Sequence, residues 1–135
     1  MVKITGEYQG DLHCAAVHGP SGSVLNTDAP KDNQGRGAAF SPTDLVATAL
    51  VTCIATTMAI AGKRHGVDIG HVRFDVTKEM SADLPRRIAR LHARFWLLPA
   101  AKAVPPGVLE KAAQGCPVHA SLAPAVEKGI ELIWA

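Results

Sequence analysis

The sequence lacks any dense run of basic or acidic residues. Among its 135 residues, 14 Lys and Arg face 12 Asp and Glu, so the formal net charge is only +2. In the densest basic stretch, residues 86–94, Arg90 and Arg94 flank His92 in two-residue steps, as on the exposed face of a strand. Without a concentrated basic stripe, we expect neither a nucleic acid nor a membrane surface as partner.

Cysteine is scarce, and the N-terminus lacks the continuous apolar segment of a signal peptide. Three cysteines are too few for the disulfide framework of a small secreted domain. We therefore expect a cytoplasmic protein in which any cysteine chemistry is redox chemistry or metal binding.

One long stretch, residues 45–62, contains no charged side chain and reaches the roughly 18-residue threshold for a membrane-spanning helix. Large aliphatic side chains are sparse in it, because alanine, glycine and four threonines supply much of its length. We interpret the stretch as the central helix of a globular core. So apolar a helix in so small a chain also suggests that a second copy helps to bury it.

The order of elements predicts a single α+β domain, residues 1–135, with an antiparallel sheet packed on helices. Alternation and turn residues predict a β-meander before residue 26, an antiparallel strand pair and a last strand. The polar loop at 28–37 has a length typical of functional loops. The expected later elements are a helix at 41–62, strands at 72–77, 89–97 and 129–134, and short helices at 107–114 and from 116 onward.

The long helix has clear end signals. Ser41 suits the N-cap and Pro42 the first helical position, where a missing N–H costs nothing. Asp44 in the first turn complements the helix dipole. Gly66, after a basic last turn, is expected to end the helix.

The cysteines lie in different surroundings. Cys53 falls in the middle of the long helix, where the dipole gives a thiolate little support. Cys116 precedes Pro117 at an expected helix start, where free N–H groups favour an anionic sulfur. Local physics therefore predicts that Cys116 is the better thiolate. Cys14, in an early strand, is expected to be structural.

Cys53 and Cys116 are far apart in sequence but can meet in a fold as a peroxidatic and resolving pair. Such chemistry needs no metal and no organic cofactor, only an external thiol or dithiol reductant. Two weaker hypotheses remain open. Cys116 and His119 have the spacing of metal ligands, which Cys53 or the neighbours His13 and Cys14 could join. Cys116 with His119 also resembles a nucleophile and its base, but no orienting acid is evident.

Three segments together resemble the OsmC/Ohr family, in particular its OsmC-like branch. The first runs from SPTDL at 41–45 through Ala49 and Leu50 to Cys53, and the second is GCPVHASL at 115–122. The third comprises residues 27–30 and the loop at 32–40.

The resemblance implies a fold and an activity. The fold would be an intertwined homodimer, with antiparallel sheets wrapped around long central helices and sites at the dimer interface. The activity would be reduction of organic hydroperoxides, and possible substrates include hydrogen peroxide. Cys53 would be the peroxidatic cysteine and Cys116 the resolving one, contrary to the dipole argument.

One departure from the family pattern concerns the pair that activates the cysteine. Better-studied members carry a Glu after the Pro at the helix start, paired with an Arg from an early strand. Here Thr43 occupies the Glu position and residues 6–10 contain no Arg. Arg36 with Asp44 is a candidate replacement. The alternative function is therefore a small hydrophobic-ligand binding protein with little or no peroxidase activity.

Overall fold

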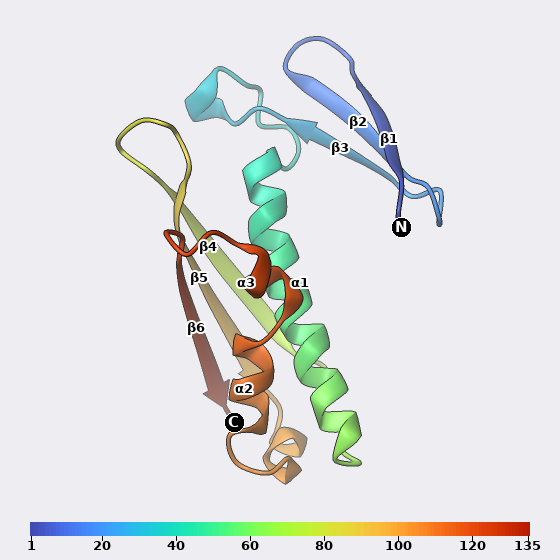
Figure 1. Ribbon diagram of the computed structural model, residues 1–135, viewed down its shortest axis with the longest axis vertical. Helices are drawn as coiled ribbons and strands as arrows, with labels where there is room; N and C mark the ends of the chain where they lie inside the picture. Colours follow the sequence, from blue (N-terminus) through green and yellow to red (C-terminus); the bar gives the residue numbers. More distant parts are fainter. The chain divides into compact units, whose positions relative to one another are not determined.

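A computed structural model describes all residues, 1–135, and the chain forms two compact units, residues 1–46 and 47–135 (Figure 1). The first unit contains strands β1 (Ile4–Tyr8), β2 (His13–His18) and β3 (Val24–Asp28), the 3-10 helix η1 (Lys31–Asn33) and the start of α1 (Pro42–Arg64). The second contains the rest of α1, β4 (Arg73–Met80), β5 (Ile88–Leu97), η2 (Pro99–Ala103), α2 (Val108–Gln114), α3 (Pro117–Ser121) and β6 (Glu127–Trp134).

The first unit is the predicted β-meander. Its strands pair antiparallel in the order β1-β2-β3. The register places Cys14 opposite Tyr8 on β1 and Thr27 on β3, and it places His13 opposite Asp28. These pairings determine the cross-strand neighbours of Cys14 and His13.

Helix α1 begins and ends at the signals in its sequence. The backbone N–H of Asp44 donates to Ser41 Oγ at 3.1 Å, and the N–H of Ser41 donates to Asp44 Oδ2 at 2.9 Å. This reciprocal capping box satisfies donors that the helix itself cannot satisfy. After the last turn, Gly66 takes φ +72°, a left-handed conformation that glycine adopts without a steric penalty.

The sheet of the second unit is mixed rather than purely antiparallel. Strands β4 and β5 pair antiparallel as predicted, whereas β6 runs parallel to β5. A parallel neighbour requires a crossover connection, and η2, α2 and α3 supply it between Leu97 and Glu127. The crossover brings the segment with Cys116 to lie alongside α1 on the same side of the sheet (Figure 1).

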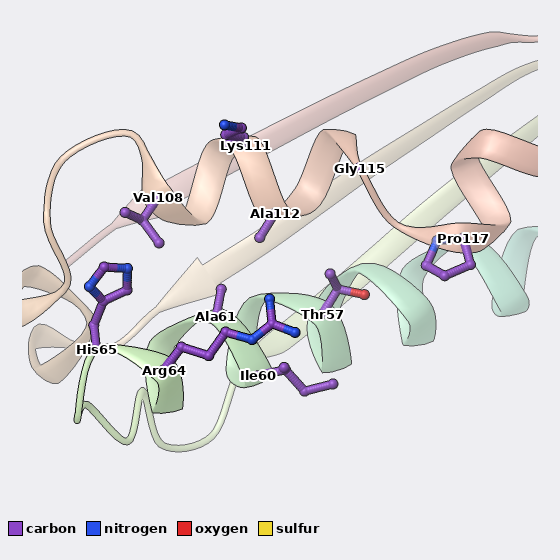
Figure 2. A pocket seen from close by; sticks show the side chains of 10 residues that line it. All are labelled: Thr57, Ile60, Ala61, Arg64, His65, Val108, Lys111, Ala112, Gly115 and Pro117. Carbon is purple, nitrogen blue, oxygen red and sulfur yellow. The ribbon is translucent and has the colours of Figure 1, made fainter.

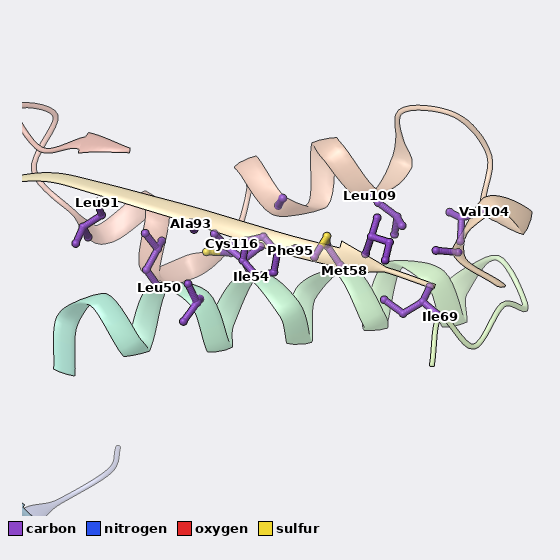
Figure 3. Close-up of a cluster of buried hydrophobic side chains, with 14 of the residues drawn as sticks. Leu50, Ile54, Met58, Ile69, Leu91, Ala93, Phe95, Val104, Leu109 and Cys116 are labelled. Atoms are coloured by element: carbon purple, nitrogen blue, oxygen red, sulfur yellow. The ribbon is translucent and has the colours of Figure 1, made fainter. Parts of the chain in front are cut away.

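The core lies between that face of the sheet and the helices (Figure 3). By length and composition α1 is apolar enough to cross a membrane, but Leu50, Ile54 and Met58 are completely buried within the protein core. They pack with the inward residues of β5, including Leu91 and Phe95. The helix is therefore a core helix of this unit, as its composition predicted.

The outer face of the same sheet carries basic and acidic side chains that pair across neighbouring strands. Arg94 forms two hydrogen bonds with the carboxylate of Asp75, and Arg90 Nε donates to Glu127 Oε2 at 2.8 Å. His92 lies between these arginines on β5, with Nε2 3.5 Å from a carboxylate oxygen of Glu131. The prediction that the basic stretch lies on the exposed face of a strand is confirmed.

Candidate redox site

Cys53 lies at the middle of α1 and is half-buried. One turn further along the helix, Thr57 Oγ1 donates to the backbone carbonyl oxygen of Cys53 at 2.8 Å. Its other neighbours include Leu50 and Ile54, which point into the core. The sulfur is therefore carried by a rigid element at the border between the core and the surface.

Cys116 is completely buried, and it is the N-cap residue of α3. Its Sγ accepts the backbone N–H of His119 at 3.3 Å. Figure 3 shows its sulfur among the buried side chains of the core, close to Ile54 and Phe95. The predicted helix start at Cys116 and Pro117 is thus confirmed.

The two cysteines meet. The side chains of Cys116 and Cys53 interact, although the residues come from different helices. The pKa of the Cys116 thiol is raised, first by burial and then by this contact with Cys53, while the N–H groups of His119 and Val118 oppose the change. Cys116 therefore remains a protonated thiol at neutral pH.

The prediction that Cys116 is the better thiolate is wrong, because its pKa is raised rather than lowered. Helix α3 has only five residues, so few peptide dipoles act on the sulfur. Burial of the thiol destabilises its anion by more than the free N–H groups stabilise it. Burial, which the sequence does not display, determines the direction of the shift.

The third cysteine, Cys14, belongs to the first unit. Cys14 is half-buried on β2 in the first unit, opposite Tyr8 and Thr27. No group of three or more His, Cys, Asp or Glu side chains comes together in a way that could hold a metal ion. The side chain of His119 is half-buried on α3.

Arg36 and Asp44, the candidate replacement for the family pair, both belong to the first unit. The carboxylate of Asp44 takes part in the capping box with Ser41 at the start of α1. Arg36 is exposed in the loop before the helix, and its charge helps to lower the pKa of Asp28. An activating role of Arg36 and Asp44 toward Cys53 stays a prediction.

A buried acidic residue was not identified from the sequence. Asp28 is 1% exposed, accepts a hydrogen bond from His13 Nδ1 and accepts the backbone N–H of Ala38 at 2.9 Å. These hydrogen bonds, with His13 the largest cause, hold the pKa of the Asp28 carboxyl below its usual range. The signal was available in the hairpin register, which places His13 opposite Asp28.

A groove of about 590 Å³ lies beside the cysteines in the second unit (Figure 2). One wall comes from α1 and the other from α2 and the segment that leads into α3. The lining residues are Thr57, Ile60, Ala61, Arg64, His65, Val108, Lys111, Ala112, Gly115 and Pro117. In the sequence, Arg64 and His65 are only part of the basic segment that precedes Gly66 at the end of α1.

Residues close in sequence to both Cys53 and Cys116 line the groove. Thr57 lies one helical turn beyond Cys53, and Gly115 and Pro117 are the two chain neighbours of Cys116. Its volume falls within the range of about 300–1,000 Å³ that is typical of small-molecule sites. Neither cysteine lines the groove itself, and Cys116 is buried in the core behind it.

The model of the family described as OsmC-like protein matches residues 34–131 of the chain. No curated protein sequence matches this chain. Among solved structures, a proposed osmotic stress induced and detoxification response protein from Psychrobacter arcticus 273-4 is 36% identical. The match covers 98% of this chain and 96% of that one, with a TM-score of 0.86.

Two more distant structures share the fold. An organic hydroperoxide resistance protein OsmC from Legionella pneumophila is 13% identical, with 98% and 96% of the two chains covered and a TM-score of 0.78. A proposed organic hydroperoxide resistance protein from Vibrio cholerae O1 biovar eltor str. N16961, with captopril bound in one of the active sites, is 16% identical. Coverage is 98% and 90%, and the TM-score is 0.77.

Proposed function

Because this chain belongs to the OsmC-like family, we propose that it is a thiol-dependent peroxidase that reduces organic hydroperoxides through Cys53 and Cys116. The interaction between the two cysteine side chains carries the proposal, because a resolving thiol must reach the sulfur that has been oxidised. Hydroperoxide resistance is also the role named for the Legionella and Vibrio proteins of the same fold.

The reaction takes place in three balanced steps. The Cys53 thiolate attacks one peroxide oxygen, the O–O bond breaks, and the products are a Cys53 sulfenic acid and the alcohol, which takes up a proton. Cys116 then gives up its proton to the departing hydroxide as its sulfur attacks the sulfenic sulfur, the S–O bond breaks, and the products are the disulfide and water. Finally an external dithiol reduces the disulfide by thiol exchange and is itself oxidised.

The environments of the two sulfurs favour Cys53 as the attacking group. Cys116 is completely buried, and its raised pKa keeps it protonated. Cys53 is half-buried and so is the more accessible of the two residues. The shielded Cys116 sulfur suits the second step, because it needs to reach only Cys53 and can lose its proton as the sulfenic oxygen departs as water.

The groove supports a second candidate function. Its apolar lining and its volume also suit a small hydrophobic-ligand binding protein in which the cysteines do not turn over. For either function we propose a cytoplasmic homodimer. The exposed side of α1 that includes Thr52 and Thr56 would then be covered by the second copy.

The test is to mix the reduced protein with one equivalent of cumene hydroperoxide, count free thiols and map disulfides by mass spectrometry. The wild type should form a Cys53–Cys116 disulfide within seconds and keep Cys14 free. Cys14→Ser is the matched control and should behave as the wild type. Three free thiols after an hour would exclude the peroxidase and favour the ligand-binding function.

A further inference from the structure

We infer that Cys116 acts as a redox switch of local structure: its reduced sulfur caps α3, and disulfide formation with Cys53 removes this cap and loosens the helix. The inference rests on the proposed pairing of the two cysteines and adds a conformational change to it. It depends on three features of the second unit: the cap itself, the weak anchorage of α3 and the firm anchorage of α1.

The reduced Cys116 sulfur takes the place of a capping hydroxyl. Cys116 is the N-cap residue of α3, with φ -66° and ψ 146°, the extended conformation typical of that position. Its Sγ accepts the backbone N–H of His119 at 3.3 Å, as the oxygen of a capping Ser or Thr would. The sulfur therefore satisfies a donor that the helix cannot satisfy by itself.

Little else holds α3 in place. The helix has five residues, far below the roughly 12–15 at which an isolated helix becomes stable, and none of them is completely buried. Besides the cap, the N–H of Ala120 donates to the Cys116 carbonyl oxygen at 3.0 Å, and Ser121 Oγ donates to the Pro117 carbonyl oxygen at 2.7 Å. Val118 packs against the core only in part. Loss of one of so few interactions therefore has a large effect on this helix.

Cys53, by contrast, lies on an element that cannot easily move. Helix α1 has 23 residues, and Leu50 and Ile54, which precede and follow Cys53 in the sequence, are completely buried. A displacement of α1 would open the core between helix and sheet, and loss of close packing there is costly. The adjustment that a disulfide requires therefore falls on α3.

The two roles of Cys116 exclude each other. In the reduced protein its side chain interacts with that of Cys53 while both thiols are free. A disulfide has a specific geometry, so the Cys116 sulfur must approach Cys53 and turn when the bond forms. A single torsion, χ1, places this sulfur on its backbone, so its new position either leaves the N–H of His119 or displaces the start of α3. In both cases the helix loses its capped geometry.

The same movement reaches the groove. Gly115 and Pro117, the chain neighbours of Cys116, line the groove from the segment that leads into α3 (Figure 2). Loosening of α3 therefore changes one wall of the groove for as long as the disulfide exists, and reduction restores it. The external dithiol then meets a different surface from the one that the peroxide meets.

The first experiment needs no peroxide. In the Cys14→Ser protein, diamide takes two electrons and two protons from the two remaining thiols, which forms the Cys53–Cys116 disulfide and reduces diamide to its hydrazine. Peptide mass spectrometry verifies the bond, and NMR measures amide hydrogen exchange in both redox states. The His119 amide should exchange roughly 5-fold faster after oxidation, whereas that of the buried Ala113 on α2 should not change. An unchanged rate at His119 would overturn the inference.

The second experiment tests the cap without oxidation. Cys116→Ser supplies a hydroxyl that can accept the N–H of His119, whereas Cys116→Ala supplies no acceptor. In the reduced proteins, the His119 amide should exchange in Cys116→Ser as in the wild type and roughly 5-fold faster in Cys116→Ala. Equal rates in the two variants would show that the sulfur does not cap α3, and the inference would fail.

The oxidants separate this inference from the peroxidase proposal. If cumene hydroperoxide forms no disulfide, but diamide forms it and the His119 amide becomes less protected, the peroxidase is wrong and the switch stands. If the peroxide forms the disulfide and the His119 amide stays protected, the switch is wrong and the peroxidase stands. If neither oxidant joins Cys53 to Cys116, both are wrong.

Discussion

The backbone N–H of His119 donates to Cys116 Sγ at 3.3 Å, yet the pKa of this thiol lies above its ordinary value because burial outweighs the hydrogen bond. The contact therefore orients the sulfur rather than ionising it. The same sulfur interacts with the Cys53 side chain, which also raises its pKa.

The raised pKa of Cys116 predicts a pH dependence of stability. In the unfolded chain the thiol ionises at its ordinary pKa, whereas in the folded protein it ionises only at higher pH. The unfolded state therefore loses its proton first, and folding loses free energy as pH rises through this interval. In urea unfolding from about pH 7 to about pH 10, the midpoint of the wild type should fall more than that of Cys116→Ala. Parallel curves would contradict the assignment.

Asp28 predicts the opposite dependence. Its pKa is lowered mainly by the hydrogen bond from His13, so its contribution to stability is present above the ordinary carboxyl pKa and is lost as pH falls through the folded value, which lies below 3.8. Asp28→Asn should lower the urea midpoint at neutral pH, and the difference from the wild type should shrink on acidification. The exposed turn residue Asp11 is the control, since Asp11→Asn should leave the midpoint unchanged. A difference that is independent of pH would exclude the mechanism.

The core face of α1 can be tested with two isoleucines of one helix. Ile54 is completely buried, whereas Ile60 is 47% exposed. Ile54→Ala should lower the free energy of unfolding by about 2–5 kcal/mol, because it removes buried methyl groups and leaves a cavity. Ile60→Ala should cost about 0.5 kcal/mol or less in monomeric protein. Urea titrations followed by circular dichroism at one pH give both values, and equal losses would mean that the helix is buried on a different face.

The cap of α1 gives a smaller effect. Ser41→Ala removes the oxygen that accepts the N–H of Asp44 and should cost about 1 kcal/mol of stability. Thr52→Ala is the control, since the exposed Thr52 hydroxyl donates only to carbonyl oxygens one turn back on the same helix. A Ser41→Ala variant as stable as Thr52→Ala would show that the capping box does not contribute.

Features set by neighbouring residues could be predicted from the sequence. Ser41 and Gly66 mark the ends of α1 because capping depends on one side chain or one permissive backbone. The alternation in residues 89–97 predicted β5 and its exposed basic face, since the period of a strand is fixed by its geometry. The segment around Cys116 and Pro117 was identified as a helix start for the same local reason.

Features that depend on distant segments could not be predicted from the sequence. Nothing near Glu127 indicates that β6 joins β5 in parallel, because the connection rather than the strand decides direction. The pKa of Cys116 follows burial by residues far away in the sequence, so the local argument gave the wrong direction. Arg64 and Lys111 line one groove only because α2 packs beside α1, and their separation of 47 positions hides this.

The central claim, that Cys53 attacks the peroxide, is tested most directly by trapping the sulfenic acid. Cys116→Ser and Cys53→Ser, each reduced, are mixed with one equivalent of cumene hydroperoxide in the presence of dimedone and analysed by peptide mass spectrometry. We predict a dimedone adduct on Cys53 in Cys116→Ser and none on Cys116 in Cys53→Ser. An adduct on Cys116, or none on either cysteine, would contradict the account.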